Sequence, residues 1–155
     1  MVVYHRILLA IDLAPDSRLI AQRARALAVA LDAELSIIHA VEPIPPVAPI
    51  PPDAVVPVTV TTEAELVAIA QERLGTLAHE LGVPETRLSI VVGNIKSEIV
   101  RSAADGGTDL IVIGSRERHG LAFLFKPTED VVVHRAPCDV LAVRLPEEDS
   151  KSKKK

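Results

Sequence analysis

Aromatic residues are scarce in this chain of 155 residues, which has no tryptophan and carries rings only at Tyr4, Phe123 and Phe125. The core must therefore be built from Ala, Val, Ile and Leu, and no row of rings is available on which nucleic-acid bases could stack. A net charge of -4 also argues against nucleic-acid binding, because domains that bind nucleic acid usually carry a basic excess. We therefore expect no nucleic-acid partner.

Cysteine is nearly absent as well. The single cysteine, Cys138, excludes an internal disulfide framework and a multi-cysteine zinc site. No apolar run reaches the ~18 residues of a membrane-spanning helix, and Asp12 interrupts the first apolar run too early for a secretory signal. We expect a soluble, cytoplasmic protein with no membrane partner.

The length and the composition fit one folded domain. A hydrophobic fraction of 48% in 155 residues is sufficient for one core, and we assign this domain to residues 1–146. The only basic cluster, Lys151 with residues 153–155, falls in residues 147–155, which we predict to be a charged, disordered tail.

Five short apolar runs predict strands. Four are nearly continuous, as in parallel strands buried on both faces, and the fifth is more polar and suits a place near an edge. In chain order they are Tyr4–Ile11, Leu35–Val41, Arg87–Val92 (the polar one), Asp109–Ile113 and Asp139–Val143.

Segments of helical period separate these runs. They cover Pro15–Leu31, with Pro15 suited to a first helical position, then Glu63–Leu81, Ile95–Ala104 and Thr128–Arg135. Gly82 and Gly106 follow two of them, as at helix ends. Strands that alternate with helices predict an α/β domain, a doubly wound, five-stranded parallel sheet with helices on both faces.

Proline is concentrated in one stretch. Seven of the twelve prolines fall in residues 43–57, which can continue neither a helix nor a sheet. This segment leaves the carboxyl end of the second strand, where a doubly wound sheet places its ligand crevice. It is a stiff connector, a lid over the crevice, or a docking site for an unknown protein partner.

Common catalytic motifs are missing. The chain has no GxGxxG after its first strand, no GxxxxGK[ST], no HExxH and no GxSxG. His39 lies in an apolar run and is better explained as a hydrogen-bonded core residue than as a ligand. His134 and Cys138 supply only two metal ligands, too few for a tetrahedral site, and Cys138 is better explained as a small buried residue.

Two places remain for a binding site. Asp12 ends the first strand at the carboxyl edge of the sheet, where its carboxylate either accepts a hydrogen bond from a ligand or braces the following loop. Gly114 follows the fourth strand and indicates close approach by a ligand, and the helix that begins at Thr128 offers free N–H groups to an anion.

The chain resembles the universal stress protein family over residues 2 to 145. The resemblance is carried by the run from Arg6 to Asp12, the Gly93-Asn94 turn with Ile99, the run from Asp109 to Ser115, and the run from His134 to Val143. Each feature is weak alone, but their order and spacing together are specific.

This resemblance implies a strand order of 3-2-1-4-5, a role in survival under stress and a homodimer paired through the last strand. The candidate interface residues are Val140, Leu141, Ala142, Val143, Arg144 and Leu145. ATP-binding members carry G-x2-G-x9-G-[S/T] after the fourth strand, whereas others, including the type-A proteins, lack these glycines and do not bind ATP.

The chain departs from that glycine motif. Gly114 matches its first position, but Glu117 and Pro127 stand at the second and third, and Thr128 supplies the final hydroxyl. A glutamate there repels phosphate and a proline removes an N–H donor, although Arg116, Arg118, His119 and Lys126 can compensate in part. The candidate nucleotide-binding residues are Asp12, Leu13, Ala40, Val41, Ile113, Gly114, Ser115, Arg116 and Thr128.

We therefore predict a non-catalytic, dimeric universal stress protein of the type-A kind, with weak or no ATP binding and no required cofactor. The first alternative is a switch that binds ATP, AMP or a cyclic nucleotide in the crevice at Asp12, Val41 and Gly114. The second is a slow ATP hydrolase, for which the sequence shows no general base or Mg²⁺ pair beyond Asp12.

Overall fold

A computed structural model of the chain describes residues 3–43, 62–115 and 128–145. Most of the proline-rich segment, Arg116 with the rest of the glycine-motif region up to Pro127, and the charged tail lie outside these residues. A single parallel sheet forms the centre of the domain, with the order β3-β2-β1-β4-β5 that was predicted. Its strands are β1 (Arg6–Ala10), β2 (Glu34–Val41), β3 (Leu88–Val92), β4 (Leu110–Ser115) and β5 (Asp139–Arg144).

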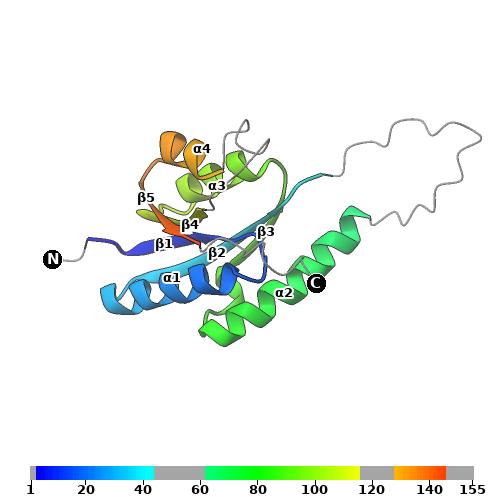
Figure 1. The fold of residues 1–155 in the computed structure, drawn as a ribbon, viewed down its shortest axis with the longest axis horizontal. Helices are drawn as coiled ribbons and strands as arrows, with labels where there is room; N and C mark the ends of the chain where they lie inside the picture. Colours follow the sequence, from blue (N-terminus) through cyan, green and yellow to red (C-terminus); the bar gives the residue numbers. More distant parts are fainter. Residues whose placement is uncertain (1–2, 44–61, 116–127, 146–155) are drawn as a thin grey trace, which may run out of the picture.

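Helices cover both faces of this sheet, as the alternating pattern predicted (Figure 1). On one face lie α1 (Ser17–Leu31) and α2 (Glu63–Leu81), and on the other lie α3 (Ile95–Asp105) and α4 (Thr128–Arg135). A short 3-10 turn, η1 (Glu85–Arg87), leads into β3. No helix among the described ranges is long and apolar enough to cross a membrane.

The core has two halves because the central strands are buried on both faces. Ile7 and Leu9 of β1 pack with α1 and α2, whereas Leu8 and Ala10 pack with α3 and α4. These four residues of β1 are at most 5% exposed. Alternate residues of a strand point to opposite faces, so burial on both sides requires the continuous apolar runs seen in the sequence.

Local hydrogen bonds explain where two helices begin. The Thr62 side chain accepts from the Glu65 N–H (3.2 Å), and the Glu65 carboxylate accepts from the Thr62 N–H (2.7 Å), which is a capping box at the start of α2. At the start of α3, the Asn94 side chain accepts a hydrogen bond from the Ser97 N–H (3.1 Å), which is a single side-chain cap. Gly82 ends α2 with a left-handed φ of 68°, as expected for a glycine after a helix.

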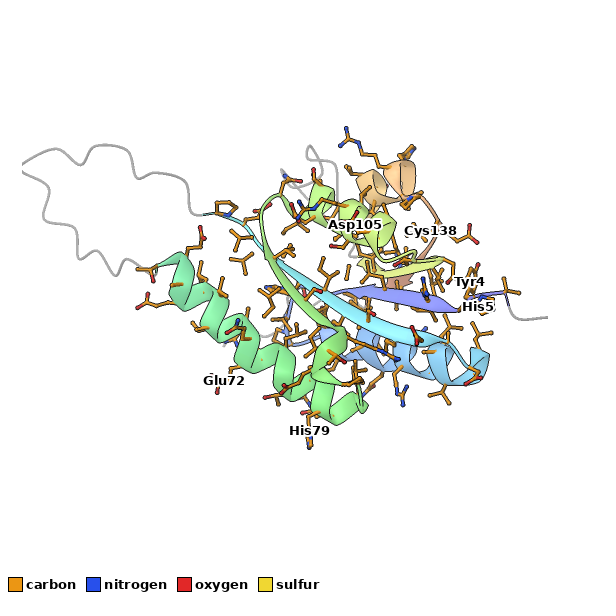
Figure 2. The ribbon with its side chains drawn as sticks, turned by 180° about the vertical axis from the view of Figure 1, so that it is seen from behind. Tyr4, His5, Glu72, His79, Asp105 and Cys138 are labelled. Atoms are coloured by element: carbon orange, nitrogen blue, oxygen red, sulfur yellow. The ribbon has the colours of Figure 1, made fainter. Side chains whose placement is uncertain are left out.

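The amino ends of the strands are held together by carboxylates. Asp109 accepts from the N–H groups of His5 (2.8 Å) and Arg6 (3.0 Å), and the Tyr4 hydroxyl donates to Asp139 (2.8 Å). Figure 2 shows Tyr4, His5 and Cys138 at this end of the sheet. The hydrogen bond to Asp139 raises the pKa of Tyr4, and burial raises the pKa of the Cys138 thiol, which keeps the thiol protonated and unreactive.

Candidate functional site

A cavity of about 280 Å³ opens at the carboxyl ends of β1, β2 and β4. This is the point at which the strand order reverses on either side of β1, where doubly wound sheets bind their ligands. Side chains from both helical layers and from the sheet line the cavity. They are Ala10, Ile11, Asp12, Ile20, Ile38, His39, Ala40, Ile95, Ile99, Ile113, Gly114, Thr128, Glu129 and Leu145.

The cavity brings together several of the predicted nucleotide-binding residues. Its lining includes Asp12, Ala40, Ile113, Gly114 and Thr128, from the segment after β1, from β2 and β4, and from α4. Leu13, Val41 and Ser115 are described but do not line it, and Arg116 lies outside the described residues. Val41 is 7% exposed and belongs to the packed end of β2.

Asp12 braces the loop that leads into α1. One oxygen of its carboxylate accepts from the Ala14 N–H (3.0 Å) and from the Ser17 hydroxyl (2.5 Å). Ser17 is 2% exposed, so its hydroxyl depends on this acceptor. The two interpretations of Asp12 are therefore compatible, because the side chain braces the loop and also lies at the cavity.

This loop corrects the predicted start of the first helix. The helix was expected to begin at Pro15, but α1 begins at Ser17, and Asp16 precedes it without a side-chain cap. The reason is local: Asp12 holds Ala14 in a turn, and Leu13 takes a left-handed φ of 61°, so the chain at Pro15 is not yet helical. A leucine in this conformation costs about 1–2 kcal/mol.

Asp12→Ala should lower the free energy of unfolding by about 1–2 kcal/mol, because the buried Ser17 hydroxyl and the Ala14 N–H both lose their acceptor. Asp12→Asn keeps an oxygen in the same place and should lose less than half as much. Urea denaturation of the three proteins measures both values. Unchanged stability of Asp12→Ala would show that the carboxylate does not brace the loop.

Gly114 has a packing role that sequence reasoning missed. A Cβ at this position would overlap the Ile20 Cδ1 and lie 3.2 Å from the Leu145 Cδ1. The glycine was interpreted as a place where a ligand approaches the backbone, but apolar side chains from α1 and from the end of β5 fill the space beside it. No local signal marks these contacts, because Ile20 and Leu145 are far from Gly114 in the sequence.

Glu129 is the second residue that sequence reasoning missed. It lies in the first turn of α4, lines the cavity, and accepts a hydrogen bond from the Ser115 hydroxyl (3.1 Å). The N-terminus of this helix was expected to attract an anion. The protein instead places its own carboxylates, Glu129 and Asp130, at that positive end of the helix dipole.

His39 is held by the backbone, as predicted for a hydrogen-bonded histidine. Its Nδ1 lies 2.8 Å from the carbonyl oxygen of Ile11. A carbonyl can only accept, so Nδ1 carries the hydrogen, and in the neutral ring Nε2 is an acceptor. The ring is half-buried and also lines the cavity, so it is part of the candidate site as well as of the fold.

The charged groups described around the cavity are of one sign. Asp12 and Glu129 are acidic, and neither lysine nor arginine occurs among the described lining residues. The described ranges contain no group of three His, Cys, Asp or Glu side chains able to hold a metal ion. His134, earlier considered as one ligand of a pair with Cys138, has its Nδ1 2.7 Å from the Asp130 carbonyl oxygen.

The predicted dimer surface lies at an edge of the sheet. β5 pairs with β4 on one side and is the last strand in the order on its other side. Leu141 is 42% exposed and Ala142 is exposed, whereas Val143 and Leu145 are 5% and 3% exposed within the subunit. Of the six candidate residues, Val143 and Leu145 therefore have side chains in the core and offer a partner only their backbone.

Comparisons with known proteins agree with this architecture. The sequence profile of the universal stress protein family matches residues 3–144. The chain is 36% identical over 143 residues to universal stress protein A homolog 2 of Coxiella burnetii, covering 92% of this chain and 96% of that one.

Solved structures show the same fold. Universal stress protein UspA from Lactobacillus plantarum superimposes with a TM-score of 0.65 at 22% identity, over 91% of this chain and 98% of that one. A universal stress protein in complex with cAMP superimposes with a TM-score of 0.63 at 24% identity, over 91% and 97%. With its strand order, its cavity at the strand ends and these matches, the chain belongs to the universal stress protein family.

Proposed function

We propose that this protein is a non-catalytic, homodimeric stress-response protein of the cytoplasm that binds ATP weakly or not at all. The observation that carries the proposal is the acidic cavity, in which Asp12 and Glu129 are present and no described basic side chain faces a phosphate. The name of the Coxiella burnetii relative, universal stress protein A homolog 2, supports the type-A kind.

Charge repulsion supports weak binding of ATP. Two like charges ~5 Å apart repel by about 1–3 kcal/mol between high and intermediate dielectric, and a triphosphate brings several charges near Glu129. Ser115 and the N-terminus of α4 hold the Glu129 carboxylate in place, so it cannot leave the cavity without breaking a hydrogen bond.

The edge of the sheet supports a homodimer. No described strand pairs with the outer edge of β5, and with its exposed Leu141 this edge is a template for a second copy of the same strand. Pairing of two β5 strands would extend the sheet across the two subunits. A further partner at the proline-rich segment, residues 43–57, stays a prediction, since residues 44–57 lie outside the described residues.

A nucleotide-dependent switch is the second candidate. It is favoured by the cavity itself, which lies at the strand ends and joins Asp12, Ala40 and Gly114, and by the cAMP complex of a similar protein. Cyclic AMP carries one negative charge and suffers less repulsion than ATP. A slow ATP hydrolase has the least support, because it requires a triphosphate to bind beside Glu129.

Calorimetric titration with ATP and AMP, with and without Mg²⁺, tests the proposal. We expect no measurable heat from ATP at nucleotide concentrations up to the millimolar range, because repulsion by Glu129 offsets the contacts of the base. A dissociation constant for ATP in the micromolar range would overturn the proposal and favour the switch. Circular dichroism of the same sample confirms that the protein is folded.

A further inference from the structure

The cavity has apolar walls and a rim of polar side chains. Its walls are formed by branched aliphatic side chains that suit a flat ring or another apolar body, namely Ile11, Ile20, Ile38, Ile95, Ile99, Ile113 and Leu145. Among the described residues, the polar side chains beside these walls are Asp12, His39, Thr128 and Glu129. A small-molecule site usually combines such a wall with a few polar groups that orient the ligand.

These polar groups mainly accept hydrogen bonds. The carboxylates of Asp12 and Glu129 only accept, and His39 uses its Nδ1 hydrogen on the Ile11 carbonyl, so in the neutral ring Nε2 is left as an acceptor. The Thr128 hydroxyl can donate and accept. A ligand that fits this rim brings hydrogen-bond donors and lacks negative charge.

We propose that Glu129 makes this cavity selective for small ligands without phosphate, such as a nucleoside, over the corresponding nucleotides. The inference rests on the proposed function and names the ligand class of the same cavity. A nucleoside offers an apolar ring to the aliphatic walls, and its amino and hydroxyl groups donate to the carboxylates and to His39. A 5′-phosphate would add negative charge at a site that already holds it.

The position of Glu129 makes its charge effective. The Ser115 hydroxyl donates to it at 3.1 Å, and the carboxylate lies in the first turn of α4, at the positive end of the helix dipole. Apolar walls screen a charge less than water does, so a nearby phosphate is repelled more strongly than at the surface. Asp130, the next residue, is exposed and does not line the cavity.

The size of the cavity agrees with a small ligand. Its volume of about 280 Å³ lies just below the usual range for small-molecule sites, about 300–1,000 Å³. A nucleoside matches this volume better than a nucleoside triphosphate does.

The test compares adenosine, AMP and ATP as probes, with calorimetry for affinity and amide NMR shifts for location. For the native protein we expect affinity to fall from adenosine to AMP to ATP. Glu129→Gln keeps an oxygen for Ser115 but removes the charge. It should strengthen AMP binding by roughly 3- to 30-fold and leave adenosine binding within about twofold.

Asp130→Asn is the matched control, because it removes the same charge from the same helical turn outside the cavity. At physiological salt it should change AMP binding by less than about twofold, since exposed charges are screened. Equal gains in the two variants would overturn the role of Glu129, since they would reflect only the net charge of the helix end.

A filled cavity tests the location. Ala40→Leu places a larger side chain on the half-buried wall and should abolish adenosine binding, with the thermal transition measured to confirm folding. Adenosine binding that survives in the folded variant, or no adenosine binding by the native protein at millimolar concentration, would overturn the inference. Micromolar ATP binding by the native protein would instead overturn the proposed function, so the two failures are distinct.

Discussion

Gly114→Ala should lower the free energy of unfolding by about 1–3 kcal/mol, with no ligand present. The added Cβ would overlap the Ile20 Cδ1 and lie 3.2 Å from the Leu145 Cδ1. Ile20 and Leu145 are each 3% exposed, so the overlap is relieved only if the end of the Ile20 side chain turns into the cavity that both residues line. Urea denaturation measures the loss directly.

Two further variants separate packing from other effects of alanine. Ile20→Val removes the overlapping methyl group, so the double variant Ile20→Val with Gly114→Ala should lose clearly less stability than the two single losses combined. Gly75→Ala is the matched control: Gly75 lies inside α2 with nothing within 4 Å of an added Cβ, and alanine there should stabilise by about 0.5–1 kcal/mol. Additive losses in the double variant would contradict the packing explanation.

A proline at position 142 should convert the proposed dimer into a monomer. The Leu145 N–H donates to the Ser115 carbonyl of β4 (2.9 Å), and successive peptide groups of a strand point to opposite edges. The Ala142 N–H therefore points to the outer edge, where a second β5 would pair. Each subunit carries the change, so the interface loses two hydrogen bonds, about 2 kcal/mol or about 30-fold in the dissociation constant before any clash of the ring.

Leu141→Pro is the contrasting variant. The Leu141 N–H points towards β4, so proline there interrupts the pairing of β4 with β5 inside the subunit and should destabilise the domain itself. Sedimentation or light scattering gives the oligomeric state, and thermal unfolding gives the stability. A dimer that persists in a well-folded Ala142→Pro variant would place the interface on another surface.

The fold was largely predictable because its signals are local or repeat along the chain. The bounds of α2 and α4 match the predicted ranges, and Gly82 marks the end of α2 as expected. The start of α1 was wrong by two residues, because the preference of Pro15 for a first helical position competes with the turn held by Asp12. That turn depends on the hydrogen bond between the Asp12 side chain and the Ala14 N–H, and the helix propensity of single residues does not predict such a contact.

The candidate site was predictable only where topology decides it. Asp12, Ala40 and Gly114 come together because the carboxyl ends of parallel strands lie at one edge of the sheet. The contact between Ser115 and Glu129, and the packing of Ile20 against Gly114, join residues that the sequence pattern does not relate. The first of these contacts brings Glu129 to the cavity beside Asp12, so the second acidic group among the described lining residues became visible only in the structure.

The pairing of β1 with β4 has a consequence during synthesis. Ala10 pairs with Ile113, and Ile7 pairs with Leu110. The edge of β1 that faces β4 therefore has no pairing partner until residues about a hundred positions later have been synthesised. At a translation rate of ~5–20 residues per second, the backbone N–H and C=O groups of this edge stay unpaired for roughly 5–20 s. The nascent chain must be protected from aggregation during that interval, and the carboxylate of Asp109, which receives the N–H groups of His5 and Arg6, arrives together with the strand that covers it.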